Sequence, residues 1–445
     1  MKHTSLILIS ALLTASCASV PRDAGMSEVQ QAVSERAHAN VEASAEPSAT
    51  DDARIGTLLH DELTADRAVA VGLINNPRLQ VILAELGIAR ADLIEASTIR
   101  NPLFEAELRF PGDPFHPYEF RLAQSLVDLI QLRQRRAIGR AEFDAAKLRV
   151  TGEVLRFAAG LRADYYDLLA ASQHVGMSRT ILESAKAAAE LAQRQHEAQN
   201  ITDLDLESEQ AHYEEAKIDL ARTEQRLLLA RETLIRGMGL RDASAEWRLP
   251  SAFPNLPPSE PDQTELERLA AARRLDIEVA RREIDIARRR VPVARLAALG
   301  EITGDVHLQR DADGARTVGP GIELPIPIFN RGEAARSRAE AQFLRARHVL
   351  NALLVESSSQ VRAAQSAVTE ARARVEYFRD VLLPRRERIV RLTQLEHNAM
   401  LAGIFQLLQA KENEAQARRD FIDAQRDYWT ARNELDLAVN GAGGH

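Results

Sequence analysis

The chain has 445 residues, a formal net charge of -8 and 45% hydrophobic residues, so it is long enough for two or three ordinary domains and apolar enough to fold. The acidic balance and the lack of a basic run with interleaved aromatic residues argue against nucleic acid as the main partner, because phosphate binding needs a basic face. Aromatic residues make up only 4%, while Ala, Leu, Arg and Glu fill long stretches, which is typical of long helices packed through small side chains.

Residues 1–16 have the pattern of an export signal. The apolar run from Leu6 to Leu13 is too short to span a bilayer as a helix. Small residues then lead to Cys17, as in a bacterial lipoprotein processing site, where the thiol carries the lipid. The alternative is an ordinary cysteine near a signal cleavage point. Residues 17–58 are expected to form a lipidated, largely irregular tether with one short helix near 27–37.

The rest of the chain is a predicted duplication. Ile88-Ala89-Arg90 recurs as Ile286-Ala287-Arg288, 198 positions later, and the offset grows to 201 toward the end of each copy. The two copies are predicted over residues 62–240 and 264–441. Residues 241–263 between them contain five prolines, so they are predicted to form a non-helical connector.

Each copy contains a stretch in which apolar and polar residues alternate, the period of a β-strand. The first stretch predicts a hairpin over about residues 103–126 with a turn at Pro111–Pro114, and the second predicts a hairpin over about 301–328. The apolar face of the second hairpin is expected to continue to Leu324 and Ile326. The charged face of the first hairpin is predicted to line water with four side chains: Glu105, Glu107, Arg109 and Arg121.

After each hairpin an apolar residue recurs every seven positions over several heptads, which predicts long helices with coiled-coil-like packing. The helix from about Leu129 to Gln199 would be about 100 Å long at 1.5 Å per residue. Pro384 falls inside the second long helix and is expected to kink it. An earlier helix over about 63–97 is expected to be interrupted at Asn76-Pro77.

These patterns predict a mainly α-helical chain with a small membrane β part. No apolar run after the signal is long enough for a transmembrane helix, so a membrane crossing would need strands. Four strands cannot close a barrel, because membrane barrels have at least about eight, so each chain is expected to share a barrel with copies of itself. The alternative is a pair of amphipathic hairpins in a soluble sheet.

In the order of its elements the chain resembles the TolC family of outer-membrane efflux factors. The resemblance rests on Ala68–Arg90 (AVAVGLINNPRLQVILAELGIAR), Leu324–Glu333 (LPIPIFNRGE) and the paired helix turns at 200–202 and 402–404. It implies a homotrimer with a twelve-stranded barrel in the outer membrane and a helical tunnel in the periplasm, a passive duct and not an enzyme. It also implies two partners, a periplasmic adaptor that grips the tunnel end and an inner-membrane pump.

The resemblance further implies which residues dock the adaptor and narrow the tunnel. The periplasmic tip is expected at residues 199–203 and 399–405, where Asn200 suits a left-handed conformation and Gly403 a tight turn. Adaptor docking is assigned to Gln199, Asn200, Ile201, Thr202, Ala402 and Gly403. The constriction is assigned to Asp203, Asp205, Gln406 and Gln409. The alternatives are plain connecting loops and a solvated acidic helix face.

No cofactor and no resident metal is expected. Glu209 and His212 have the spacing of di-iron ligands, but the second motif and the further carboxylates of such sites are missing. Residues 398–411 and 427–439 look like a branch associated with copper or other heavy-metal export, so metal ions or toxic small molecules are the expected cargo. A lipid-anchored periplasmic coiled-coil scaffold without a pore is the alternative function.

Overall fold

The computed structural model describes residues 23–37, 49–110, 117–241, 247–297, 300–311 and 313–441. The export signal, Cys17 and the turn predicted at Pro111–Pro114 lie outside these residues. The chain divides into two compact units. The first contains the N-terminal residues to Val29, Leu83–Val150 and Leu275–Val355, and the second contains Gln30–Ile82, Thr151–Arg274 and the residues from Glu356 onward. Each unit therefore takes segments from both predicted copies.

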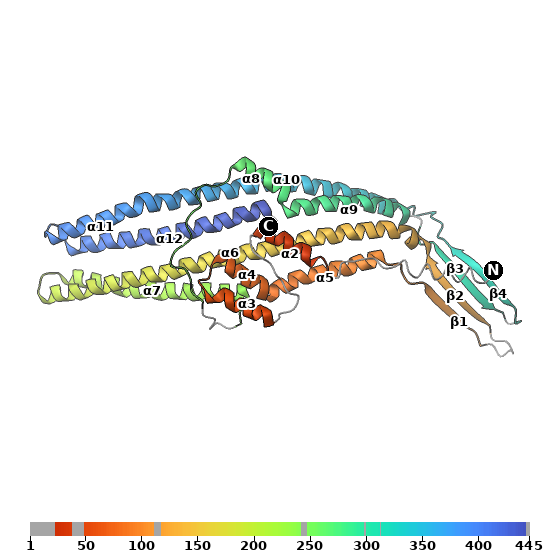
Figure 1. The fold of residues 1–445 in the computed structure, drawn as a ribbon, viewed down its shortest axis with the longest axis horizontal. Coiled ribbons are helices and arrows are strands. Elements are labelled where there is room, and N and C mark those ends of the chain that lie inside the picture. The colour runs from red at the N-terminus through yellow and green to blue at the C-terminus, as the bar shows by residue number, and fades with distance from the viewer. Residues whose placement is uncertain are drawn as a thin grey trace. The chain divides into compact units, whose positions relative to one another are not determined.

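The first unit carries a four-stranded antiparallel sheet (Figure 1). Its strands, in order across the sheet, are β1 (Leu103–Leu108), β2 (Tyr118–Ser125), β3 (Thr303–Arg310) and β4 (Arg316–Glu323). Both predicted hairpins are thus present, and they pair side by side through β2 and β3. Because β1 and β4 each pair with one strand only among the described residues, they form the two edges of the sheet.

The register places apolar side chains in rows across one face of the sheet. Ala106 lies opposite Phe120, Phe120 opposite Leu308, and Leu308 opposite Val318. Successive residues of a strand point to opposite faces, so the charged residues share the other face. The predicted continuation of the apolar strand to Leu324 and Ile326 was wrong. The strand β4 ends at Glu323, and the prolines that follow at 325 and 327 have no N–H to donate to a ladder.

The helices of the first unit are α5 (Pro77–Ser97), which starts in the second unit, α9 (Leu275–Ala297), and the first parts of α6 (Leu126–Glu197) and α10 (Glu333–Tyr377). The helix α6 has 72 residues, which confirms the predicted long helix. A small buried core joins α6 and α9 through Ile138, Ala141, Ala145 and Ile286. Beside it, Arg290 of α9 donates to Glu142 of α6 at 2.5 Å.

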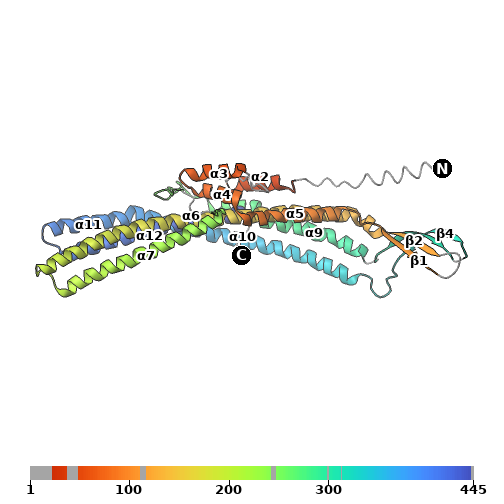
Figure 2. The same cartoon turned by 90° about the horizontal axis from the view of Figure 1, so that it is seen from below.

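The second unit contains α3 (Ala49–His60), α4 (Ala65–Asn75), α7 (Asp203–Met238), α8 (Gln263–Arg273), α11 (Leu383–Asn398), α12 (Ile404–Asn440) and the remaining parts of α6 and α10. Figures 1 and 2 show α7 alongside α6 and α12 alongside α11, each pair joined by a short turn. Val361, Val368, Val375 and Tyr428 are at the centre of the buried core that joins α10 and α12. In the described part of the chain, no helix has both the length and the apolar character needed to cross a membrane.

The region expected to be a mostly irregular tether contains two helices. The first, α2 (Met26–Ala37), coincides with the short helix predicted near 27–37. The second, α3, was not expected, and it buries Ile55 and Leu59. Two buried aliphatic side chains are enough to hold so short a helix against a neighbour. A helical period can be recognised in a sequence only when apolar residues recur at more positions than this, so α3 was not predicted.

In each predicted copy, the residue that separates the first two helices donates a hydrogen bond to the end of the last helix. Asn76 follows α4, and its amide donates to the carbonyls of Arg236 at 3.1 Å and Gly237 at 2.6 Å, near the end of α7. Arg274, which is 198 positions later, follows α8 and donates to the carbonyl of Ala438 in α12 at 3.3 Å. These donors satisfy carbonyls that a helix end leaves without intrahelical partners. The predicted interruption at Asn76-Pro77 is confirmed.

The second long helix does not simply kink at Pro384. After α10 the chain forms a π-helical turn, η1 (Phe378–Leu382), in which the N–H of Leu383 bonds the carbonyl of Phe378. Proline has no N–H, and its ring crowds the carbonyl four residues earlier, so a wider turn just before it relieves the clash.

Candidate functional site

The turns after α6 and after α11 have the same backbone hydrogen bonds. The N–H of Gln199 bonds the carbonyl of His196 at 2.8 Å, and 201 positions later the N–H of Met400 bonds the carbonyl of His397 at 2.9 Å. Gln199 and Met400 also adopt left-handed conformations, with φ of 60° and 58°. The two predicted tip turns are therefore structural repeats.

The left-handed conformation expected at Asn200 was wrong, and Gly403, expected to suit a tight turn, is not the left-handed residue of the second turn either. Among the described residues, Asn200 is not in the left-handed region, and Gly403 has φ of -72° as the N-cap of α12. The position of the left-handed residue is set by where the preceding helix ends, at Glu197 and Asn398 respectively, and not by which residue adopts that conformation most easily.

Each turn is followed by a helix start in which the third residue bonds back to the cap. Thr202 caps α7, and Asp205 accepts from the Thr202 N–H at 3.1 Å and from its hydroxyl at 2.8 Å. At the equivalent place in the second copy, the Oε1 of Gln406 accepts from the N–H of Gly403 at 3.3 Å. Two of the residues predicted at the constriction are thus the capping residues of α7 and α12.

The other two predicted constriction residues also have local partners. The Asp203 side chain is 95% exposed, and its Oδ1 lies 2.6 Å from Nε2 of His196. The amide of Gln409 donates to Glu412 at 3.3 Å. His196 was not singled out from the sequence, although His397 at the offset of 201 positions was a signal that both turns use a histidine. The role of the four residues at a constriction stays a prediction.

Apolar side chains stand exposed beside the predicted docking residues. Leu204, Met400 and Leu401 are exposed at the two turns, whereas Ala402 of the predicted docking set is buried. The remaining docking residues are exposed or half-buried. Met400 and Leu401 lie within the predicted tip at 399–405 but outside the predicted docking set, and Leu204 lies one residue beyond the tip predicted at 199–203.

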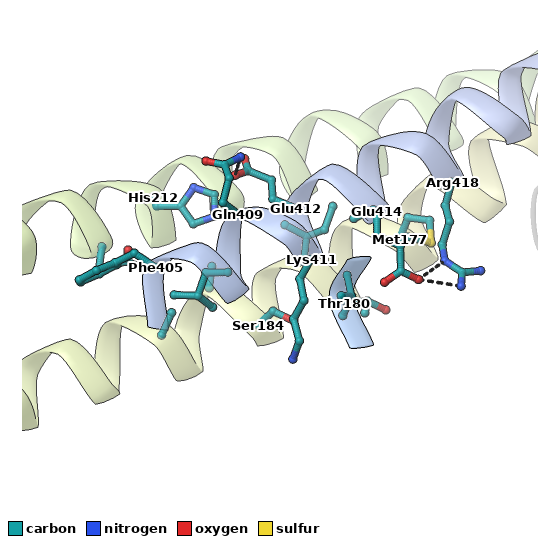
Figure 3. A pocket seen from close by; sticks show the side chains of 17 residues that line it. Met177, Thr180, Ser184, His212, Phe405, Gln409, Lys411, Glu412, Glu414 and Arg418 are labelled. Atoms are coloured by element: carbon teal, nitrogen blue, oxygen red, sulfur yellow. Dashed lines mark hydrogen bonds and ion pairs between the residues drawn. The ribbon is translucent and has the colours of Figure 1, made fainter. Parts of the chain in front are cut away.

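A cavity of about 480 Å³ lies between α6, α7, α11 and α12 (Figure 3). Its apolar lining comes from Met177, Ile181, Val390, Phe405 and Leu408. Charged and polar side chains line the rest, and Figure 3 shows Gln409 and Glu412 bonded together in one part and Glu414 paired with Arg418 in another. One predicted constriction residue, Gln409, therefore lines this cavity.

Glu209 and His212, the pair with di-iron spacing, also line this cavity. Burial raises the pKa of Glu209, and the nearby carboxylate of Glu412 raises it further, while His212 lowers it. Among the described residues, no group of three or more His, Cys, Asp or Glu side chains is arranged to hold a metal ion.

Polar side chains join α12 to α6 and α7 farther along the helices. Arg419 of α12 pairs with Asp219 of α7, and both bond the hydroxyl of Ser178 in α6, at 2.8 and 2.9 Å respectively from that oxygen. His174 of α6 lies 3.1 Å from Asp423 of α12, and this bond lowers the pKa of the Asp423 carboxyl. These contacts hold three helices of the second unit in one arrangement.

The predicted water-lining residues come together on the polar face of the sheet. Arg109 donates to Glu107 at 2.8 Å. Arg121 lies among three carboxylates, 2.9 Å from Glu323, 3.4 Å from Asp305 and 3.5 Å from Glu105. Asp305 and Glu323 were missed from the sequence, since the order in which two hairpins pair cannot be read from alternation.

Comparisons with known proteins agree with this architecture. Residues 266–441, within the second predicted copy, match the family described as outer membrane efflux protein. The cobalt-zinc-cadmium resistance protein CzcC of Cupriavidus metallidurans is 23% identical over 389 residues, which cover 84% of this chain and 89% of that protein.

Solved structures have the same fold. The CmeC outer membrane channel of Campylobacter jejuni is 17% identical, with a TM-score of 0.72 over 85% of each chain. VceC of Vibrio cholerae is 17% identical, with a TM-score of 0.70 over 85% of this chain and 96% of that one. CusC is 16% identical, with a TM-score of 0.70 over 86% of this chain and 93% of that one. Residues 266–441 thus match the outer membrane efflux protein family, and the chain has the fold of solved outer membrane channels, which favours a channel subunit over the scaffold without a pore.

Proposed function

We propose that the chain exports heavy-metal cations across the outer membrane. The observation that carries this cargo is the similarity to CzcC, a cobalt-zinc-cadmium resistance protein, over 84% of the chain and 89% of that protein. The charges on the sheet are compatible with it. The polar face carries Glu105, Glu107, Glu119, Asp305 and Glu323 against Arg121 and the nearby Arg109, and an excess of carboxylates favours cations over anions in a water-filled passage.

The channel itself is proposed to be a homotrimer with a shared barrel. Channels of the TolC family form trimers. One chain supplies four strands with two open edges, fewer than the about eight strands of the smallest membrane barrels, so three copies would give twelve strands and no free edge. The apolar face would contact lipid, and the face with Arg121 would line water.

The periplasmic end is proposed to dock an adaptor through the two repeated turns. The docking residues would be Gln199, Asn200, Ile201, Thr202, Ala402 and Gly403. Leu204, Met400 and Leu401 support this assignment, because exposed apolar side chains at a loop tip suit a protein partner. An inner-membrane pump would supply the cargo. Asp203, Asp205, Gln406 and Gln409 are proposed to narrow the tunnel just inside this end, and Cys17 is proposed to carry the lipid anchor.

The cargo is tested by deleting the gene in its own bacterium and measuring growth inhibition by metals and by organic toxins. We expect the deletion strain to become more sensitive to cobalt, zinc, cadmium or copper salts, with unchanged sensitivity to ethidium and detergents. Re-expression of the full chain should restore tolerance. Increased sensitivity to ethidium alone, with metal tolerance intact, would overturn the metal cargo and leave the channel assignment standing.

A further inference from the structure

If the sheet continues into another copy of the chain, the directions of its two edge strands determine which residues of the two copies lie side by side. All neighbouring strands are antiparallel, so β4 runs opposite to β1, and the β1 of a second copy can pair antiparallel with β4. In such a pair, the residues that follow β4 lie beside the residues that precede β1 of the other copy. These are Leu324–Phe329, here named the post-strand segment, and Ile99–Pro102 together with Leu103, the first residue of β1, here named the pre-strand segment.

Both segments expose apolar side chains in the single chain. In the post-strand segment, Leu324 is 54% exposed, Ile326 76%, Ile328 63% and Phe329 99%. In the pre-strand segment, Ile99 and Leu103 are exposed. Four large apolar residues within six positions form a patch that a soluble surface does not usually carry, and such patches mark contacts with a partner.

The post-strand segment has a definite shape despite its exposure. Gly300 is left-handed, and a Cβ there would lie 2.3 Å from Cγ of Pro325, so the segment passes close against the chain just before β3. The N–H of Ile328 bonds the carbonyl of Ile326 at 2.8 Å, and the side chain of Asn330 accepts from the N–H of Gly332 at 3.0 Å. The apolar side chains are therefore presented by a folded backbone.

The pre-strand segment is also held in place. The carbonyl of Arg100 accepts from the amide of Gln124 at 3.2 Å, and its N–H bonds Asp128 at 3.2 Å. Arg135 of α6 donates to the carbonyl of Thr98 at 3.0 Å. A neighbouring chain would thus meet a rigid surface and would lose little conformational entropy on binding it.

We propose that the post-strand segment covers the pre-strand segment of a neighbouring copy and locks the seam between chains at the periplasmic end of the barrel. The proposal rests on the shared barrel of the proposed function. A chain cannot make this contact with itself, because β1 and β4 are three strand spacings apart, about 14 Å across the sheet. Membrane lipid and the adaptor are the other candidate occupants, and the experiments below separate them.

Disulfide trapping tests the contact. Ile326→Cys is combined in turn with Ile99→Cys, Asn101→Cys or Leu103→Cys, so that three registers of the seam are covered. A disulfide requires Cα atoms about 4.4–6.8 Å apart, so a bond within one chain is out of reach. We expect at least one pair to shift the chain on a non-reducing denaturing gel to the masses of two and three chains. Ile326→Cys with Arg140→Cys, an exposed position on α6, should stay at the mass of one chain.

Further controls identify the partner. Each single-cysteine variant alone measures any crosslinking through Cys17, and two differently tagged chains that carry one substitution each must give a mixed dimer if the bond joins neighbours. Intact trimers on a native gel with no crosslink in any of the three pairs would overturn the seam contact and leave the proposed function standing. Absence of trimers in the unsubstituted chain would overturn the proposed function itself.

Lipid contact is tested separately with Phe329→Trp in vesicles that contain brominated phospholipids. We expect no added quenching relative to the unsubstituted chain, whose Trp247 and Trp429 give the background. Strong quenching of the new tryptophan would show that lipid covers the segment and would overturn the proposal. Phe329→Asp should lower the temperature at which the trimer dissociates on a gel, while Phe329→Leu should keep it, because only the first removes the apolar contact.

Discussion

The carboxylate of Asp205 accepts hydrogen bonds from both the hydroxyl and the backbone N–H of Thr202. The hydroxyl contributes most, and together these bonds hold the pKa of Asp205 below its ordinary value, because they stabilise the charged form. The cap therefore stabilises α7 at pH values above the ordinary carboxyl pKa, and it is lost as the pH falls through the lowered pKa. We expect the amides of Asp205 and Leu206, which bond Thr202, to lose protection from hydrogen exchange only in that acidic window.

Substitution gives the matching control for this cap. Asp205→Ala should speed exchange in the first turn of α7 at neutral pH, whereas Asp205→Asn should speed it less, since the amide keeps an oxygen acceptor. Asp203→Ala, which removes a neighbouring carboxylate outside the cap, should leave the turn protected. If Asp205→Ala exchanged at the unsubstituted rate, the hydrogen bonds to Thr202 would not stabilise the helix start.

Ion conductance tests whether Asp205 also faces the tunnel. If three copies of this carboxylate lie near a three-fold axis, they repel one another and attract cations. Asp205→Asn should then reduce the cation preference of the channel in a planar bilayer without loss of the trimer. Gln409→Ala should change the preference less, because glutamine is neutral. An unaltered ion preference in Asp205→Asn would restrict this residue to its capping role.

Arg121 is expected to tolerate substitution poorly. Alternation alone places Arg121 at a water-facing position, where Arg121→Gln would be tolerated. In the structure Arg121 lies among Glu105, Asp305 and Glu323, and the Asp305 side chain is only 8% exposed. Loss of the cation would leave three carboxylates repelling one another on one face of the sheet.

We therefore expect Arg121→Gln to lower the temperature at which the trimer dissociates and to increase the cation preference of the channel. Arg109→Gln is the control, because Arg109 pairs with Glu107 two residues away, and both side chains are more than half exposed. Equal dissociation temperatures for the two variants would mean that the network around Arg121 does not hold the sheet together.

Local and periodic features of the fold were predictable from the sequence. The hairpins, the long α6 and the break at Asn76-Pro77 follow from alternation, heptads and a helix-breaking proline. The left-handed residues of the turns were not predictable in this way. Gln199 and Met400 take that conformation because of where the preceding helices end, and helix ends depend on packing.

Contacts between distant segments account for most of what the sequence analysis missed. Arg121 and Glu323 are 202 positions apart and meet only because β2 pairs with β3 and β3 with β4. Asn76 and Arg274 make equivalent bonds to helix ends in the two predicted copies. Because one is an amide and the other a guanidinium, comparing the two copies by sequence does not reveal that equivalence. The capping bonds of Asp205 and Gln406 depend on where α7 and α12 begin, which a family resemblance does not specify.

Lipid attachment at Cys17 is the prediction that concerns the N-terminal region. Cys17→Ser should abolish the incorporation of radiolabelled palmitate, since this is the one cysteine of the sequence. A spanning element anchors more firmly than a single lipid signal, so a fraction of the variant should stay in the membrane pellet. Palmitate label on the Cys17→Ser protein would show that the lipid is attached elsewhere or not through a thiol.

The proline-rich connector is held to the second unit by Glu260. Its side chain is 12% exposed, and it accepts from the hydroxyl of Tyr428 at 2.6 Å and from Arg372 at 3.1 Å, besides pairing with Arg432. Burial and the bond to Glu260 raise the pKa of Tyr428, so its hydroxyl keeps its proton and remains a donor. Arg372 also donates to the carbonyl of Pro257 at 2.8 Å, which ties the connector to α10 through the same side chain.

Glu260→Ala should therefore destabilise the second unit by about 1–3 kcal/mol, because it removes the acceptor that Tyr428 and two half-buried guanidinium groups share. Glu260→Gln should cost less, since it keeps one oxygen acceptor for Tyr428. Glu267→Ala is the matched control: Glu267 of α8 lies 3.6 Å from Arg362 and accepts from the amide of Gln263 at 3.0 Å, and a surface ion pair of that kind contributes less than about 1 kcal/mol. The three variants are compared by urea unfolding, followed by the circular dichroism signal of the helices. Equal urea midpoints for Glu260→Ala and Glu267→Ala would mean that the connector is held by its prolines and not by the Glu260 carboxylate.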